Sequence, residues 1–417
     1  MDGRAPKGVV AHQHFRDGLA NANFAAYRAD AKMRVRDEAE FDRMRAHLQS
    51  LHEGLDVQHS FVNDAGQLFD CIPIEQQISL RGKKGALPKP PDLTGIAGAA
   101  GAPKKVKRVA PATGRRDRHG NVMVCPPGCI PVRRVTLEEI ARFRTLDDWR
   151  RKGPARSHLA APDVPLADVK ANHRYAYVQQ DIANLGAHNF LNVWSPSVGE
   201  AQIFSLAQHW YAAGVDATHQ TLEVGWQVYP GKYGHSQPVL FIFWTNDNYK
   251  NSTVYNLEGP GFVQTNLAWQ IGGALAPTSS DGGQQYEIEV TVYLYQGNWW
   301  LYLGGIGAKD AVGFFPTSIY QGGAMASNAA QILFGGETVC EETGTWPPMG
   351  SGVLANAGWM HAGYQRDIYY FPTSGGAQYA SLIGHTPSPS AYTQQLGNAR
   401  PPWNTYFFYG GPGSANC

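Results

Sequence analysis

Short runs that alternate apolar and polar residues fill the chain after Asp168, and they constrain its fold more than any other feature. In "YEIEVTVYLY", Glu287 and Glu289 fall on one face of a strand, and the isoleucine, valines and leucine between them fall on the other. Other such runs, each bounded by turn residues, are "QPVLFIFWT", "NWWLYLGG" and "NTYFFYGG". No helix–strand alternation suggests parallel βαβ units. The pattern predicts a mostly β, antiparallel sandwich or barrel, with both glutamates on its solvated face.

The residues before this region predict a small α+β unit. An amphipathic helix is indicated by a stripe of apolar residues at helical spacing: Phe41, Met44, Leu48 and Leu51. The "NDAG" turn in "HSFVNDAGQLFDCIPI" predicts a hairpin, and Thr136 with Glu139 forms a capping box ahead of a short helix. We expect two domains, residues 1–165 and 166–417, that meet in a proline-rich segment.

Residues 81–120 predict an exposed linker inside the first domain. The segment carries eleven Lys and Arg against two Asp, and it is otherwise rich in Gly, Ala and Pro, so it cannot bury a core. A basic run can bind nucleic acid, but this one has no interleaved aromatic residues to stack on bases. We therefore expect no nucleic-acid partner.

Charge divides the chain into two opposite parts. From Asp168 to the end there are 7 Lys and Arg against 15 Asp and Glu, a net charge of −8, which leaves 28 against 19, or +9, for the residues before it. A basic front and an acidic back in one chain should attract each other.

The five cysteines favour disulfides and an oxidising compartment. "CPPGC" has a CxxxC spacing without a second Cys or His pair, so no metal site is expected. No apolar run reaches the roughly 18 residues that a membrane span needs, so no membrane partner is expected. "MDGRAPKGVVAHQHF" shows no apolar leader; the chain is either intracellular or numbered from after a removed signal.

Carboxylates are the main candidates for catalysis, because the sequence lacks HExxH, GxSxG, P-loop and dinucleotide-binding motifs. Glu223, in "QTLEVGWQVYP", and Glu337, in "AAQILFGGETVC", stand out since each is bracketed by glycine and large apolar residues. Two carboxylates on one concave face can hydrolyse a substrate: the ionised one takes a proton from water, and the protonated one stabilises an oxyanion or protonates the leaving group.

Several blocks, in order, resemble the neprosin family of glutamic peptidases. They are "LEVGWQVYP", "LFIFWTNDNY", "YNLEGPGFVQ", "FGGETV", "PPMGSG" and "YFFYGGPG" over most of 170–417, with "HSFVNDAGQLFDCIPI" and "CPPGCIPVRRVTLEEI" resembling the family's propeptide. The resemblance implies a secreted zymogen of an acid-acting prolyl endopeptidase, without cofactor or metal. Its front domain would inhibit a catalytic β-sandwich of two curved, jelly-roll-like sheets until it is removed in acid. It also implies proline-containing peptides or proteins as substrates, and it places the two catalytic glutamates on Glu223 and Glu337.

The resemblance also sets expectations for other residues of the chain. Gln227, on the strand face of Glu223, would assist the oxyanion or hold the water, and Gln208, Trp226 and Tyr229 are further candidates for the cleft. Two cysteines that bracket "YNL" in plant members, and one before the last "GGPG", are absent here. The remaining cysteines then pair as Cys340 with Cys417, and Cys71 with Cys125 or Cys129.

Two other functions fit an aromatic β-sandwich. One is a carbohydrate-binding module, in which Trp299 or Trp300 would stack on sugars, although adjacent strand residues point to opposite faces. The other is a glycoside hydrolase that uses the same two carboxylates, and these would then stand about 5–5.5 or 6.5–9.5 Å apart.

Overall fold

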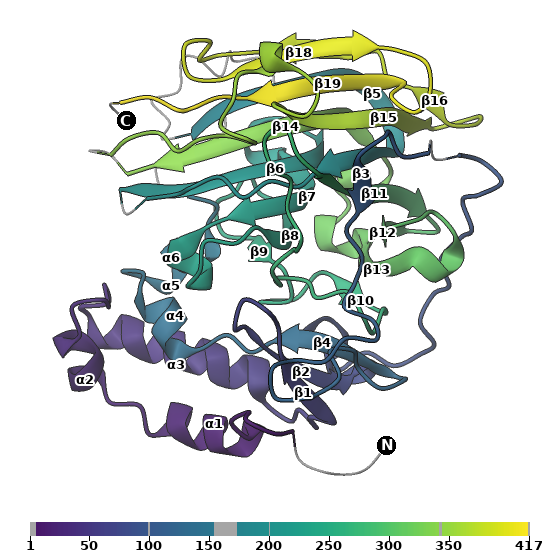
Figure 1. The fold of residues 1–417 in the computed structure, drawn as a ribbon. Coiled ribbons are helices and arrows are strands. Elements are labelled where there is room, and N and C mark those ends of the chain that lie inside the picture. Colours follow the sequence, from purple (N-terminus) through teal and green to yellow (C-terminus); the bar gives the residue numbers. More distant parts are fainter. Residues whose placement is uncertain (1–5, 99–100, 154–172, 200, 342–343, 416–417) are drawn as a thin grey trace.

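The computed structural model describes residues 6–98, 101–153, 173–199, 201–341 and 344–415 (Figure 1). The strands after residue 172 are β5 (His173–Asn192), β6 (Gln202–Ala213), β7 (Gln220–Val228), β8 (Val239–Thr245), β9 (Thr253–Tyr255), β10 (Val263–Gln264), β11 (Gln285–Tyr295), β12 (Asn298–Leu303), β13 (Ala311–Pro316), β14 (Ala329–Cys340), β15 (Gly363–Pro372), β16 (Gln378–Tyr379), β17 (Ile383–His385), β18 (Thr393–Asn398) and β19 (Thr405–Gly410). One short helix, α6 (Pro230–Tyr233), follows β7.

These strands form a curled antiparallel sheet that closes over its own core. Its main path runs β10-β13-β12-β11-β5-β14-β6-β7-β8-β9, and the long strand β5 carries the sheet from one layer to the other. The first half of β5 pairs with β14, and its second half pairs with β11 and β15. Residues from both layers, such as Trp226 of β7 and Val290 of β11, pack in one buried cluster. The predicted mostly β, antiparallel sandwich is confirmed.

The front part packs below the sandwich as a small α+β unit (Figure 1). Its elements are α1 (His12–Ala20), α2 (Phe24–Ala29), α3 (Glu38–His52), β1 (His59–Val62), β2 (Leu68–Pro73), β4 (Cys129–Arg133), α4 (Leu137–Ala141) and α5 (Leu146–Arg150). The remaining strand before residue 153, β3 (Val106–Arg108), lies beside β11 in the sheet of the sandwich. The expected hairpin is β1–β2, the expected amphipathic helix is α3, and the capping box of Thr136 and Glu139 starts α4. None of the described helices is long and apolar enough to cross a membrane. The expected domain boundary falls on residues 154–172, outside the described part of the chain.

The cysteines follow one of the two expected patterns. Cys71 is bonded to Cys125, with 5.4 Å between their Cα atoms, and Cys129 is a buried free thiol. Cys340 is disulfide-bonded. Its expected partner, Cys417, lies outside the described residues, so that pairing stays a prediction.

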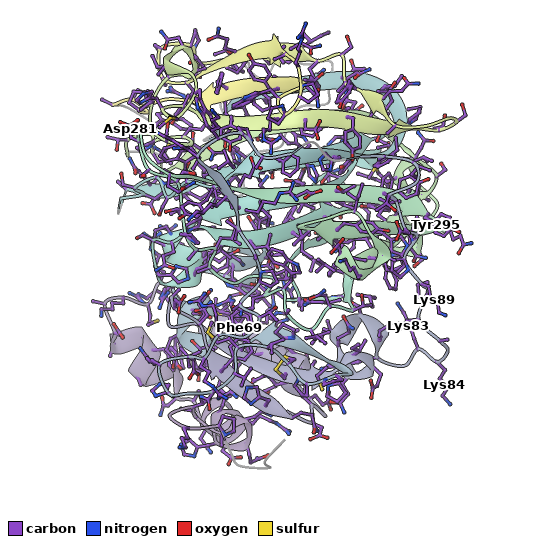
Figure 2. The ribbon with its side chains drawn as sticks, turned by 45° about the vertical axis from the view of Figure 1, so that its right-hand side comes forward. Phe69, Lys83, Lys84, Lys89, Asp281 and Tyr295 are labelled. Carbon is purple, nitrogen blue, oxygen red and sulfur yellow. A yellow bond between two sulfur atoms is a disulfide. The ribbon has the colours of Figure 1, made fainter. Side chains whose placement is uncertain are left out.

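The expectation that residues 81–120 form an exposed linker is only partly correct, because some of these residues are buried. Lys83, Lys84 and Lys89 project outward as expected (Figure 2). Leu93, however, is fully buried against Trp300 and neighbouring aromatic residues, and β3 joins the sheet by pairing with β11. The linker therefore covers the outer face of the β11 layer instead of standing free.

Because the linker covers this face of β11, a second expectation is also wrong. Glu287 and Glu289 do point away from the inner core, as the alternation predicts, but they are 0% and 1% exposed and not solvated. Glu287 forms a buried ion pair with Arg366 of β15, and Glu289 forms one with Arg108 of the linker. A period of two assigns two faces to a strand, but it does not tell what else in the chain covers each face.

Candidate active site

Glu223 and Glu337 come from strands that both neighbour β6. In the register, Glu223 of β7 lies opposite Trp210 of β6, and Glu337 of β14 lies opposite Leu206 on the other side of that strand. Both glutamates face away from the inner core, since the residues that alternate with them, such as Val224, pack inside it. The two residues that sequence analysis selected are therefore brought together on one outer face.

The close approach of β6 explains why position 225, two residues after Glu223, is a glycine. A Cβ on Gly225 would lie 2.0 Å from the carbonyl oxygen of Ala207 on β6, so no larger side chain fits there. Gln208 lies between Gly225 and Gly335 in the register and faces the same side as the glutamates. Neither of the two strands that flank Gln208 therefore places a side chain directly beside it.

Lys152, just beyond α5 of the front part, occupies the site. Its Nζ lies 2.5 Å from Glu223 Oε2 and 2.6 Å from Glu337 Oε2, and it donates a hydrogen bond of 3.1 Å to Gln208 Oε1. The side chains of the lysine and of both glutamates are at most 5% exposed. One ammonium group therefore bridges the two carboxylates and closes them off from solvent.

Each glutamate also has its own hydrogen-bonding partners. At Glu337, His173 Nδ1 lies 2.5 Å from Oε1, and the Tyr175 hydroxyl donates to the same oxygen at 3.2 Å. At Glu223, the hydroxyl of Tyr249 donates to Oε1 at 2.9 Å, with a second, longer bond of 3.1 Å from Thr221. An imidazole such as that of His173, at Glu337, can carry a positive charge, whereas the hydroxyls of Tyr249 and Thr221, at Glu223, are neutral.

Burial and charge act against each other on these groups. Burial raises the pKa of Glu337, but Lys152 and His173 beside it lower that pKa by more, so that its net value is about 2. Burial likewise lowers the pKa of Lys152, but the two glutamates outweigh it and leave that pKa above its ordinary value. Burial and the adjacent carboxylates raise the pKa values of Tyr175 and Tyr249 well above the ordinary value, so both act as neutral donors. In this closed form Glu337 is ionised over the whole mildly acidic range.

The other residues expected in the cleft lie in different surroundings, and not all of them are close to the two glutamates. Gln208 contacts Lys152 and so belongs to the site. Gln227 shares the face of Glu223, but among the described residues its amide donates to Tyr255, at 3.3 Å. Trp226 lies in the core between the layers, where its indole donates to Asn192 O, so its selection as a cleft residue is wrong.

The last of these residues, Tyr229, also lies on the side of the dyad. It packs there in a separate cluster, with Phe204 and with Phe143 of the front part. It thus contributes to the contact between the two parts of the chain.

Five of the described residues that contact the dyad were not found from sequence: Lys152, His173, Tyr175, Thr221 and Tyr249. His173 and Tyr175 stand two apart at the start of β5, so a strand assignment from residue 173 would have placed them on one face. Lys152 is the last of three basic residues in "DDWRRKG", and nothing in that run distinguishes it.

Further ion pairs join the front part to the sandwich, as the opposite charges of the two parts predict. Arg133 of β4 reaches Glu258 at 3.2 Å, and Lys232 of α6 holds the other oxygen of that carboxylate at 2.9 Å. On the surface, Arg34 pairs with Glu341 at 3.0 Å.

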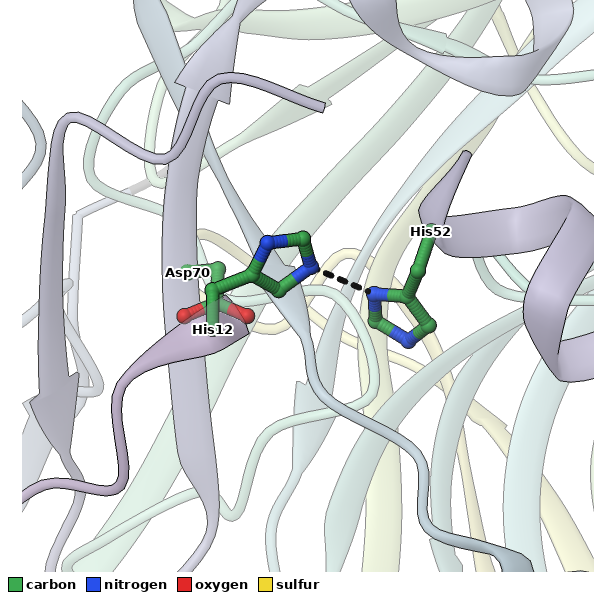
Figure 3. A group of neighbouring side chains, drawn as sticks. All are labelled: His12, His52 and Asp70. Carbon is green, nitrogen blue, oxygen red and sulfur yellow. Dashed lines mark hydrogen bonds between the residues drawn. The ribbon is translucent and has the colours of Figure 1, made fainter. Parts of the chain in front are cut away.

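One cluster in the front part has the residue types of a metal site (Figure 3). His12 Nε2 lies 3.2 Å from His52 Nδ1, with Asp70 beside them. Both carboxylate oxygens of Asp70 already accept from Arg134, at 2.5 and 2.7 Å, and Ser60 donates to one of them at 2.7 Å. A guanidinium in this position opposes a second cation, so the three residues do not fit a metal ligand set.

Comparison with known proteins agrees with the resemblance seen in the sequence. The family described as Neprosin matches residues 201–412, just over half of the chain. Among solved structures, the chain is similar to a scytalido-glutamic peptidase with a peptide-based transition-state analog, at 11% identity and a TM-score of 0.29, over 58% of this chain and 98% of that chain.

Two other solved structures are similar over a large share of their own length. SCP-B, a member of the eqolisin family of peptidases, matches at 10% identity and a TM-score of 0.27, over 58% of this chain and 98% of that chain. A homodimeric agglutinin from chicken liver matches at 8% identity and a TM-score of 0.21, over 39% and 94%. The family match extends over both glutamates and every strand from β7 to β19, and the chain therefore belongs to the neprosin family, a family of glutamic-type peptidases.

Proposed function

We propose that the chain is the secreted zymogen of an acid-acting glutamic endopeptidase that cleaves after proline. The observation that carries the proposal is the position of Lys152, which the front part inserts between Glu223 and Glu337. A buried lysine that bridges two carboxylates of a peptidase fold prevents substrate and water from reaching them. The disulfide between Cys71 and Cys125 supports a secreted, oxidised protein.

In the proposed mechanism, Glu337 is the general base and Glu223 the general acid. When Lys152 leaves, Glu337 keeps His173 at 2.5 Å, whereas Glu223 keeps the hydroxyls of Tyr249 and Thr221. Two close carboxylates share one proton in acid, and we assign that proton to Glu223, whose partners are hydroxyl groups. Glu223 is then protonated and Glu337 is ionised.

The chemical step follows from these protonation states. Ionised Glu337 takes a proton from a water molecule as that water attacks the carbonyl carbon of the scissile peptide. Protonated Glu223 donates a hydrogen bond to the carbonyl oxygen as negative charge develops there, and Gln208 can donate a second one from its amide. The proton on Glu337 then passes to the leaving amine, so the dyad is regenerated.

Aromatic side chains near the dyad support a preference for proline. Lys152 Nζ lies 5.9 Å from the centre of the Phe241 ring, and Phe243, next to Glu223 in the register, stacks on Tyr249. Flat rings of this kind can pack against a pyrrolidine ring. Trp299 and Trp300, which a carbohydrate-binding module would need on its surface, are 0% and 1% exposed.

Removal of the front part requires a cut beyond Lys152. A cut within residues 81–120 would leave the two halves of the front part joined, because Cys71 and Cys125 lie on either side of that segment. We therefore place the activating cut between Lys152 and β5, which begins at His173.

The proposal is tested by incubation of the full chain at about pH 3–5, where a carboxylate pair can share one proton. Mass spectrometry should show loss of about the first 165 residues, after which a proline-containing peptide should be cleaved on the carboxyl side of proline. Glu223→Gln should do neither. Equal cleavage by the wild type and Glu223→Gln would show that the dyad assignment is wrong, and cleavage of peptides irrespective of proline would remove the proposed specificity.

A further inference from the structure

The first half of the linker packs on the sandwich with a period of three residues. In "LPKPPDL", residues 87–93, Lys89 and Asp92 are exposed, whereas the residues before, between and after them are half-buried or buried. Lys89 projects outward in Figure 2. Proline-rich segments favour the polyproline II helix, which has three residues per turn. The period therefore indicates that this segment lies on the sandwich as a polyproline II helix, with every third residue turned to solvent.

The surface beneath this segment is aromatic. Leu93 is fully buried in a cluster with side chains from three strands of the sandwich, and Leu87 and Ala97 pack against the same cluster. The aromatic members of the cluster, which we call the aromatic face, are Trp300 and Tyr302 of β12, Phe314 of β13, and Tyr369 and Phe371 of β15. Aromatic surfaces bind proline-rich segments well, because polyproline II is formed before binding and little entropy is lost.

Two hydrogen bonds fix the backbone of the segment on this face. The Tyr302 hydroxyl donates to Pro91 O at 2.8 Å, and the Leu93 amide donates to Ile306 O at 3.0 Å. Both bonds use groups that every peptide backbone offers. The face therefore recognises the course of an extended, proline-rich backbone together with one buried leucine.

The proposed maturation removes the occupant of the aromatic face. The linker lies before Lys152, so a cut between Lys152 and β5 separates it from the sandwich with the rest of the front part. An uncovered patch of large apolar side chains on a soluble enzyme marks a binding surface. This patch lies on β12, β13 and β15, whereas the dyad lies on β7 and β14.

We propose that in the matured enzyme the aromatic face is an exosite that binds proline-rich segments of protein substrates in the polyproline II conformation. The inference rests on the proposed function, which removes the linker and names proline-containing substrates. It narrows the substrate class to proteins that carry a proline-rich run, with a leucine at its end, apart from the bond that is cut. Docking of that run raises the effective concentration of the substrate at the dyad.

Charge beside the aromatic face favours a basic occupant. On β11, Glu289 stands two residues before Thr291, which lies opposite Tyr302 in the register, so Glu289 is on the same side of the sheet. In the intact chain Arg108 of the linker pairs with Glu289 at 2.8 Å. When the linker is gone, a basic residue of the substrate can take that place. The expected occupant is thus both proline-rich and basic, as the linker is.

Peptide binding to the intact chain tests the face without any need for catalysis. The probe is a fluorescent peptide of residues 86–98, and its binding is followed by fluorescence anisotropy at neutral pH. The full chain should bind it poorly, because its own linker competes at a high effective concentration, and the full chain with Leu93→Asp should bind it at least about tenfold more tightly. In that chain, Tyr302→Phe should weaken binding about fivefold.

Two altered probes test the register of the contact. A probe with Leu93→Asp should bind at least about tenfold more weakly, since a buried leucine is lost. A probe with Lys89→Gln changes an outward position and should bind as the unaltered probe does. If the chain with Leu93→Asp misfolds, Leu93→Ala is a milder way to free the face and should also increase binding.

Matured enzyme tests the role in substrate selection. Two substrates share one cleavable proline bond, flanked by a fluorophore and its quencher, and a flexible spacer joins it to "LPKPPDL" or to the same run with Leu93→Asp. The first should have a KM about tenfold lower at an equal kcat, because docking away from the dyad stabilises bound substrate and transition state alike.

Each outcome decides the inference. Absence of probe binding to both Leu93 variants of the chain, or equal binding of the unaltered probe and the Leu93→Asp probe, would overturn it. Equal KM values for the two substrates would overturn the exosite, and so would a front part that stays bound to the sandwich after the cut, or a matured dimer that the probe does not dissociate. A chain that never matures in acid would refute the proposed function instead, and probe binding to the intact chain would still decide what the face accepts.

Discussion

Lys152→Ala should convert a slow zymogen into a rapidly maturing one. Lys152 and His173 together lower the pKa of Glu337 from its ordinary 4.5 to about 2, which corresponds to roughly 3 kcal/mol of stabilisation of the closed form. Loss of one partner from a buried ion pair costs about 3–5 kcal/mol, in the same range. Because the lysine is 5% exposed, solvent screens this interaction little. We therefore expect the closed form to lose about 3 kcal/mol, and the open fraction to rise about 100-fold.

The pH range of the assay follows from the sign of the pKa change. Glu337 has a lowered pKa in the closed form, so the contribution of Lys152 is complete above the ordinary glutamate pKa and is lost only as the pH falls toward 2. At about pH 5 the wild type should still be closed, and the variant should lose its front part about 100 times faster, at a rate independent of protein concentration. The rate is read from the intact mass over time.

Two matched variants control for unspecific effects of the substitution. Lys152→Arg keeps the charge and should mature slowly, whereas Arg151→Ala changes the preceding residue, whose side chain is 32% exposed and whose nearest carboxylate in Asp148 is 3.9 Å away. Arg151→Ala should mature at the wild-type rate. If Lys152→Ala matures no faster than the wild type, the lysine is a structural contact and does not control latency.

Three further predictions address the residues around the dyad and the stability of the front part. His173→Asn should raise the pKa of Glu337, so the acidic limb of the pH–rate profile of the matured enzyme should move to higher pH while its KM changes little; an unmoved limb would remove His173 from its positioning role. Tyr249→Phe removes the 2.9 Å bond to Glu223 and should lower kcat about tenfold; an unchanged kcat would contradict a role for this hydroxyl. Cys71→Ser with Cys125→Ser opens a loop of 54 residues and should destabilise the front part by about 4 kcal/mol, seen as a lower first transition in calorimetry; an unshifted transition would mean that the disulfide does not stabilise it.

The sequence was most informative where a short-range rule decides the structure. The period of two along "QTLEVGWQV" correctly put Glu223 and Gln227 on one face and the apolar residues, Trp226 among them, on the other. It could not show that Gln227 is directed to Tyr255, because that depends on β8 and β9 beside it. Glu337 was paired with Glu223 through the family resemblance, since no spacing in the chain links two residues on strands separated by β6.

Contacts between distant segments account for what sequence reasoning missed. The side chain of Lys152 enters the dyad because α5 ends at Arg150 and packs its Trp149 beneath the sandwich, where Lys232 donates to the Trp149 carbonyl. No local pattern contains that geometry. Glu289 was assigned to solvent for the same reason, as only the tertiary structure shows that the linker covers it.

The most direct test of the central claim is the fate of Glu337→Gln in acid, followed by intact mass. The side chain of glutamine has nearly the same shape as that of glutamate, so the chain should fold. It should remain uncut at about pH 4 for as long as the wild type needs to mature, because a dyad with one carboxylate cannot activate water. A trace of matured wild-type enzyme should then cut it, which shows that its cleavage site is accessible. If Glu337→Gln matures alone at the wild-type rate, Glu337 is not the catalytic base and the account of the dyad is wrong.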